Sequence, residues 1–210
     1  MTFVSFFAKK QIIIAVLFLL LFRLPEALLT PVSQLFLQAL PSKGGLGLSP
    51  QEFGLVNGTV GVIGFLVGGV IGGMLISRDG LKKWLWPMTL AITIPNLTYV
   101  YLAYVMPENL MLINVCVAIE NLGYGFGFSA YMLFMIYFSQ GEHKTSHYAL
   151  CTGLMALSMM LPGLFAGALA QAAGYRLFFI IVMISCLLPF CVASYLKIDA
   201  NFGKKEREEE

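Results

Sequence analysis

Long runs of apolar residues, separated by short polar stretches, dominate the chain. They predict six membrane-spanning helices, at residues 11–38, 52–77, 84–106, 108–139, 146–172 and 177–196. A bilayer core is about 30 Å thick, so a spanning helix needs roughly 20 mostly apolar residues. The pattern therefore predicts an all-α integral membrane domain at 11–196, with a short segment at 1–10 before it and a charged, disordered tail at 197–210.

The composition supports a membrane protein and argues against several other classes. Hydrophobic residues make up 59% of the chain and charged residues 11%, whereas soluble domains carry about 25% charged residues. The net charge of +2 gives no reason to expect a nucleic-acid partner. His143 and His147 lie one turn apart without further ligands nearby, so we expect a solvated loop and no metal site. No catalytic set or cofactor-binding motif occurs, so we do not expect an enzyme.

The basic residues predict the orientation of the spans. If the six spans are correct, Lys43 and Arg176 lie on one side of the membrane. Arg23 lies within a span, and the other ten lie on the opposite side: Lys9, Lys10, Arg78, Lys82, Lys83, Lys144, Lys197, Lys204, Lys205 and Arg207. Cytoplasmic loops carry an excess of Lys and Arg. We therefore expect a multi-pass protein with both termini in the cytoplasm.

Three ionisable residues, Arg23, Glu26 and Glu120, lie deep within the predicted spans. A charge at the bilayer centre costs a few kcal/mol even on the lenient insertion scale, which makes each a candidate functional residue. Arg23 and Glu26 are three residues apart, so they can pair on one helix face. Pro25 between them frees backbone carbonyls that need protein or water nearby, which favours a polar cavity. The alternative is an ion pair that only joins two helices.

We expect Glu120 to have no partner within one turn of its own helix. A carboxyl group held away from water is a candidate for taking up and releasing protons. The alternative is a permanently protonated group that is hydrogen-bonded to a neighbouring helix. In the second predicted helix, Gly64, Gly68 and Gly72 share one face. Such a face predicts close helix packing, either as ordinary membrane packing or as a sliding surface of a transporter.

The loop after the second predicted helix resembles a known signature. Its residues Gly73, Leu75, Ser77, Arg78, Gly80, Lys82 and Lys83 resemble the Gly-x-Leu-x-Asp-Arg-x-Gly-basic-basic motif of the major facilitator superfamily. Ser77 stands in place of the usual Asp, and Leu81 occupies the first basic position. Because the second copy of this motif is usually degraded, the resemblance implies the C-terminal six-helix half. It also implies a gating loop formed by Arg78, Asp79, Gly80 and Lys82.

Longer stretches resemble the muropeptide permease branch of that superfamily. They are Arg23-Leu24-Pro25-Glu26-Ala27, the glycine-rich stretch around Asn57, Glu120-Asn121-Leu122 with Gly125 and Gly127, and Tyr148-Ala149-Leu150. The resemblance implies two inverted three-helix repeats whose first helices line a central cavity. It further implies proton-driven import of cell-wall sugar–peptide fragments across a bacterial inner membrane. Glu120 and Glu26 would couple protons, and the substrate would contact Arg23, Glu26, Asn57, Glu120, Asn121 and Tyr124.

The length leaves the assembly open. The family has twelve helices, and six alone would leave half a cavity facing lipid, with Arg23 and Glu26 exposed. A missing N-terminal half or a second copy in a parallel homodimer would close that cavity. The alternative to a half-transporter is a non-transporting membrane scaffold or sensor that keeps the fold.

Overall fold

The protein is all-helical in the part that the computed structural model describes, residues 2–199 and 201–204. The α-helices of the first half are α1 (Thr2–Phe7), α2 (Ile12–Leu21), α3 (Leu24–Gln38), α4 (Pro50–Phe53) and α5 (Val62–Asp79). Those of the second half are α6 (Leu81–Thr93), α7 (Leu97–Val105), α8 (Leu110–Ser139), α9 (Lys144–Ser185) and α10 (Leu187–Ser194). The short 3₁₀-helices η1 (Pro41–Lys43) and η3 (Ile94–Asn96) and the π-helix η2 (Gly54–Gly61) complete the set.

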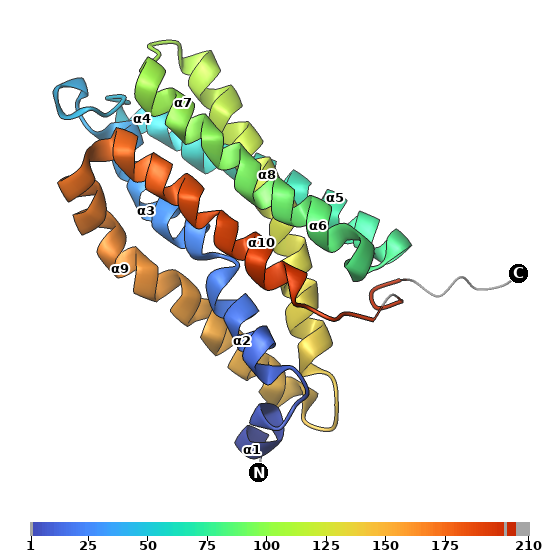
Figure 1. The fold of residues 1–210 in the computed structure, drawn as a ribbon. Coiled ribbons are helices and arrows are strands. Elements are labelled where there is room, and N and C mark those ends of the chain that lie inside the picture. The colour runs from blue at the N-terminus through green and yellow to red at the C-terminus, as the bar shows by residue number, and fades with distance from the viewer. Residues whose placement is uncertain (1, 200, 205–210) are drawn as a thin grey trace, which may run out of the picture.

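Within the described residues, five helical stretches are long and apolar enough to cross a membrane. They are Ile12–Gln38, Pro50–Asp79, Leu81–Val105, Leu110–Ser139 and Lys144–Ser194, with mean hydropathy between 1.3 and 2.6. Figure 1 shows them side by side in an elongated bundle. The predicted all-α membrane fold is confirmed.

The last of these stretches turns back on itself at Gly174. As one straight helix, its 51 residues would be about 77 Å long, more than twice the thickness of a bilayer core. Gly174 instead has φ 76° and ψ 157°, which no helix contains. Figure 1 shows the chain returning along the bundle from α9 into α10. If the segments before and after Gly174 each cross the membrane, this stretch provides two spans and the chain has six. The number six therefore stays a prediction.

The first predicted helix is divided in two at Arg23. Helix α2 ends at Leu21 with Phe22 as its C-cap, and Arg23 leaves helical geometry with φ −100° and ψ 7° before α3 begins. Pro25 lies in the first turn of α3, where its missing N–H is tolerated. The proline therefore interrupts the span at the level of its charged residues.

The glycine face of α5 packs directly against α8, as predicted. Gly64, Gly68 and Gly72 are buried. A Cβ added at Gly64 would lie 3.0 Å from the carbonyl oxygen of Ala118, and one at Gly72 would lie 2.7 Å from the Ser129 hydroxyl. Only glycine allows the two backbones to come this close. Because no hydrophobic force drives helices together in lipid, this close van der Waals packing is what holds α5 against α8.

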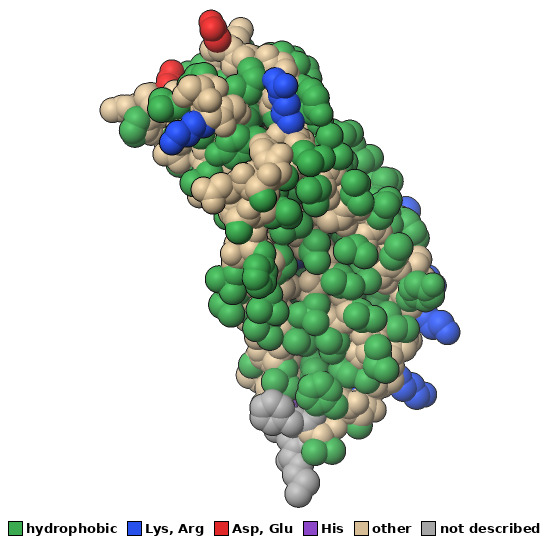
Figure 2. All heavy atoms as spheres, turned by 60° about the vertical axis from the view of Figure 1, so that its left-hand side comes forward, with side chains coloured by type: hydrophobic (Ala, Val, Ile, Leu, Met, Phe, Trp, Pro, Cys, Tyr) green, Lys and Arg blue, Asp and Glu red, His purple; other side chains and the backbone are tan. Residues whose placement is uncertain are grey.

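A polar layer separates two hydrophobic clusters inside the bundle. One cluster gathers Phe18, Phe22 and residues 130–138 of α8, and the other gathers residues 29–37 of α3 with Ile113, Cys116 and Val117 of α8. Between them along the chain lie the buried Arg23, Glu26 and Glu120. The outer surface is largely apolar, and on the face in Figure 2 the charged side chains lie toward the margins.

The basic residues gather at two opposite ends of the bundle. At the larger group, Lys9 donates to the carbonyls of Phe138 and Gln140, and the Lys197 N–H donates to Gln11. At the other end, Arg176 donates to the carbonyl of Ala103 at 3.1 Å. For the basic residues in the described part of the chain the predicted grouping is therefore present, while the side of the membrane that each end faces stays a prediction.

Two expectations for the basic end were wrong. His147 is not in a solvated loop: it lies in α9, is 3% exposed and is within hydrogen-bond distance of Ser5. The tail is also not wholly disordered, because Phe202 packs on Tyr137 with ring centroids 4.8 Å apart. His147 packs against the ring of Phe6, with ring centroids 5.5 Å apart, and Phe202 is held by burial of its apolar ring. Residue 200 and residues 205–210 lie outside the described part of the tail.

Candidate functional site

Polar side chains from four of the membrane stretches converge on one cavity of about 240 Å³. Its walls come from α3, from η2 with the start of α5, from α7 and from α8. They comprise Leu29, Thr30, Ser33, Gln34, Asn57, Val62, Phe65, Tyr99, Glu120, Asn121 and Tyr124. Asn57 lies within the π-helix η2, a form that often occurs at functional sites. The structure thus brings together four of the six predicted substrate residues: Asn57, Glu120, Asn121 and Tyr124.

Glu120 is 6% exposed and reaches the cavity wall. The amide of Asn121 donates to its carboxyl oxygen at 2.7 Å and to the carbonyl of Val117 at 3.0 Å. The expectation that Glu120 lacks a partner within one turn of its own helix was therefore wrong, because the neutral amide of the next residue reaches its carboxyl group. A carboxyl held by one amide group keeps further acceptor positions for a proton or a solute.

Arg23 lies in an aromatic cage rather than in an ion pair. Its guanidinium donates to the Tyr124 hydroxyl and lies 4.7 Å from the ring centroid of Phe128 and 5.7 Å from that of Tyr131. Over the described residues, Lys83–Asp79 is the only ion pair within 4.0 Å. The predicted Arg23–Glu26 pair was wrong, because the helix break at Arg23 removes the regular spacing on which it depended. Cation–π contacts with a planar guanidinium replace it.

Glu26 is 1% exposed and accepts a hydrogen bond from the Asn96 amide at 3.1 Å. Asn96 lies in η3, within the break between α6 and α7. Glu26 does not line the cavity. Its predicted role as a substrate contact therefore has no support from position, although it lies in the same polar layer.

The expected exposure of Arg23 and Glu26 in an open half-cavity was also wrong. Arg23 is 6% and Glu26 1% exposed in the single chain. Aromatic rings from α8 cover Arg23, and Asn96 with its neighbours covers Glu26. The single chain therefore shields its own deep charges.

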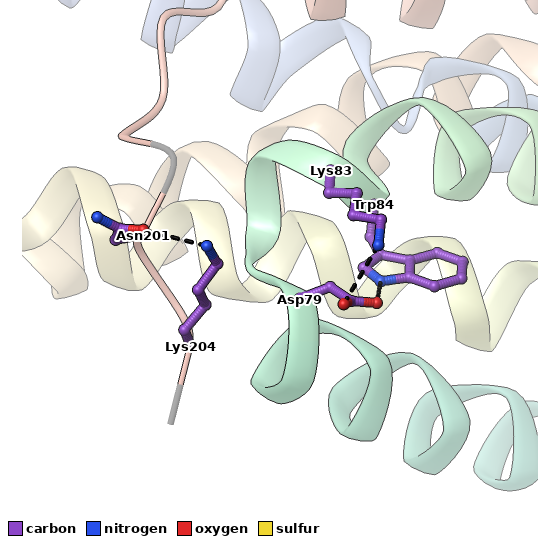
Figure 3. A network of polar contacts seen from close by, with 5 residues as sticks. All are labelled: Asp79, Lys83, Trp84, Asn201 and Lys204. Atoms are coloured by element: carbon purple, nitrogen blue, oxygen red, sulfur yellow. Dashed lines mark hydrogen bonds and ion pairs between the residues drawn. The ribbon is translucent and has the colours of Figure 1, made fainter. Parts of the chain in front are cut away.

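The predicted gating loop lies at the basic end, where α5 ends and α6 begins (Figure 1), so the length of α5 separates it from Asn57 in the cavity wall. Asp79 accepts from the Trp84 indole at 3.0 Å and pairs with Lys83 at 3.2 Å, as Figure 3 shows. Gly80 has φ 89° and ψ 155°, a conformation that favours glycine. The backbone N–H of Leu81 donates to the carbonyl of Phe202, so the tail is attached to this loop. Arg78 and Lys82 are exposed.

The sequence reasoning missed several polar residues around the site. Thr30, Ser33 and Gln34 line the cavity from α3, as does Tyr99 from α7. Their spacing of three and four residues places the α3 group on one helix face. Polar side chains with this spacing inside an apolar span were the signal that could have identified this wall. Asn96, an amide in the middle of a span, was the corresponding signal for the partner of Glu26.

Comparison with known families decides the classification. Residues 15–210 match the family described as Major Facilitator Superfamily. The chain belongs to the major facilitator superfamily. This confirms the resemblance drawn from the loop after the second span.

Curated relatives point to one branch of this superfamily. Over 205 residues the chain is 26% identical to "Anhydromuropeptide permease" of Escherichia coli (strain K12), covering 94% of this chain and 40% of the relative. Over 192 residues it is 25% identical to "Putative transporter AmpG 1" of Rickettsia prowazekii (strain Madrid E), covering 90% and 41%. The chain thus spans about 40% of the length of the curated relatives that it matches.

Proposed function

We propose that this chain is half of a secondary transporter that imports a small polar solute together with protons. The observation that carries the proposal is the cavity beside Glu120, where polar groups from several spans meet within an otherwise apolar bundle. A cavity with a few directed polar groups is the usual form of a solute site. In this superfamily such sites lie near the middle of the membrane, between helix repeats.

The solute class follows from the relatives. One of them is named as an anhydromuropeptide permease, so we propose a cell-wall sugar–peptide fragment as the solute. The amide of Asn57 can donate to and accept from sugar hydroxyls and peptide amides, and the Ser33 hydroxyl, which donates to the carbonyl of Thr30, can still accept. The cavity in this half is about 240 Å³, so we propose that a complementary half supplies the remaining wall.

Glu120 is the proposed proton carrier. It is buried, faces the cavity and has a neutral amide partner. A proton on a buried carboxyl lowers the free-energy cost of keeping it from water, so proton binding and closure of the cavity are coupled. Arg23 positions Tyr124 at the cavity wall through its hydrogen bond. Glu26 is a second candidate for the proton carrier, although it does not line the cavity.

The proposed setting is the bacterial inner membrane. The basic end, with residues 1–10 and 197–210, would face the cytoplasm, and residues 11–196 would form the membrane domain. The complementary half would be an N-terminal half or a second copy of this chain. The mass of the complex extracted from its native membrane distinguishes the two, because a homodimer contains only chains of 23.1 kDa.

The test is uptake of a labelled anhydromuropeptide into liposomes that contain the native complex, driven by an imposed pH gradient. Glu120→Gln should abolish gradient-driven accumulation but keep exchange of solute across the membrane. Glu108→Gln, at an exposed position outside the spans, is the matched control and should behave as the unmodified protein. Equal accumulation by both variants would remove Glu120 from the mechanism. Accumulation without a gradient would refute proton coupling.

A further inference from the structure

A second cavity lies at the basic end of the bundle, separate from the proposed solute site. Its volume is about 450 Å³, and it is lined by Lys9, Lys10, Gln11, Ala15, Phe134, Tyr137, Phe138, Gln140, Leu196 and Lys197. Three lysines contribute to this wall, and no acidic residue of the described chain does. The cavity is therefore strongly cationic.

The ammonium groups of the three lysines can still bind an anion. Lys9 donates to the carbonyls of Phe138 and Gln140, which holds its ammonium group at the wall. Lys10 and Lys197 are exposed, and neither forms an ion pair within the described residues. Tyr137 and the side-chain amides of Gln11 and Gln140 add neutral hydrogen-bonding groups at the same cavity. A ligand with several anionic oxygens would satisfy these groups together.

The position of the cavity suggests where such a ligand comes from. Three membrane stretches begin or end beside it: Ile12–Gln38 begins, and Leu110–Ser139 and Lys144–Ser194 end. The cavity therefore lies just outside the hydrocarbon core, at the depth of lipid headgroups. Ala15, Phe134, Phe138 and Leu196 give it an apolar side that continues toward the spans.

We propose that this cavity binds the phosphate-bearing headgroup of an anionic lipid. The three lysines would bind the phosphate, while the apolar side contacts the start of the acyl chains. Anionic lipids attract basic side chains near the membrane surface, and basic pockets between helices on the cytoplasmic side are suited to their headgroups. Because the lipid would contact α2, α8 and the segment after α10 together, it would bridge and stabilise the ends of three spans.

The test is native mass spectrometry of the full chain in detergent with phosphatidylglycerol or with phosphatidylcholine of the same acyl chains. We expect retention of phosphatidylglycerol and little retention of phosphatidylcholine. The double variant Lys10→Gln/Lys197→Gln should weaken phosphatidylglycerol binding by about fivefold per lysine removed, from an attraction of about one kcal/mol for each basic residue near the surface. Both side chains are exposed, so folding should be unaffected.

The matched control is Lys82→Gln/Lys144→Gln, which removes the same charge from exposed positions at the same end but outside the cavity. It should bind phosphatidylglycerol as the unmodified chain does. If both double variants weaken phosphatidylglycerol binding equally, the effect comes from overall charge, and the proposed binding site is refuted. Equal retention of the two lipids would also overturn it. If inorganic phosphate displaces phosphatidylglycerol at a concentration equal to that of the lipid, the cavity binds a soluble phosphate, and the proposal of a lipid ligand is refuted.

Discussion

The close packing of α5 on α8 leads to a prediction that separates helix contact from helix propensity. Gly68 and Gly73 lie in the same helix, but their surroundings differ. A Cβ at Gly68 would lie 2.9 Å from the backbone nitrogen of Phe126 and 3.0 Å from the carbonyl carbon of Leu122, and it would also meet the Leu122 oxygen. At Gly73 a Cβ meets no atom within 4 Å. The two positions therefore form a matched pair.

The magnitude follows from these distances. Carbon atoms pack best at about 3.5–4.0 Å, so Gly68→Ala must move the two backbones apart by about 1 Å or more, because the Leu122 oxygen lies closest to the added Cβ. Such overpacking costs about 1–3 kcal/mol. Both substitutions gain the same helix propensity, about 0.5–1 kcal/mol. The difference between the variants is therefore the overpacking cost itself: Gly68→Ala should be less stable than Gly73→Ala by about 1–3 kcal/mol.

Equilibrium unfolding in mixed micelles with increasing dodecyl sulfate measures this difference, with helical circular dichroism as the signal. Gly73→Ala should unfold at or above the denaturant concentration of the unmodified chain, and Gly68→Ala clearly below it. If Gly68→Ala proves as stable as Gly73→Ala, the backbones of α5 and α8 are not in contact at this point. The packing of the glycine face would then be refuted.

Three further predictions concern polar groups and use the same unfolding assay. Tyr131→Phe removes the hydrogen bond to the carbonyl of Leu19 and should cost about 1 kcal/mol; an unchanged stability would contradict that bond. Asn96→Leu takes away the donor of the buried Glu26 and should cost about 1–3 kcal/mol, most of it recovered if Glu26 also becomes Leu. Burial lowers the pKa of Lys9 from its usual 10.5. Because the unfolded chain then binds that proton more tightly, the free energy of unfolding should rise with pH on approach to 10.5, and Lys9→Met should lack that rise.

Much of the fold could be predicted because the bilayer imposes strong constraints on sequence. Backbone groups in lipid must be satisfied within the chain, so long apolar runs become helices. The same constraint made Arg23, Glu26 and Glu120 conspicuous, and all three are buried in one polar layer. The glycine face of α5 was also visible, because small residues four apart have few other uses in a span.

The partners of the charged residues could not be predicted. Arg23 and Glu26 have a spacing that suits an ion pair, but the break before Pro25 moves Arg23 off the α3 helix. Its actual partner, Tyr124, is 101 residues away along the chain. Asn96 is 70 residues from Glu26. Such contacts depend on how helices are placed next to each other, which local spacing does not record.

By itself, the sequence determined the helical membrane class, the long apolar helices, the grouping of the described basic residues at two ends and the presence of three ionisable residues within apolar helices. These properties follow from periodicity, length and the cost of charge in lipid, all of which act locally along the chain. Tertiary structure alone decided the aromatic cage around Arg23, the Glu26–Asn96 bond, the α3 wall of the cavity and the lysine-lined cavity at the basic end. Each of these joins residues from different helices, and only packing in three dimensions brings them together.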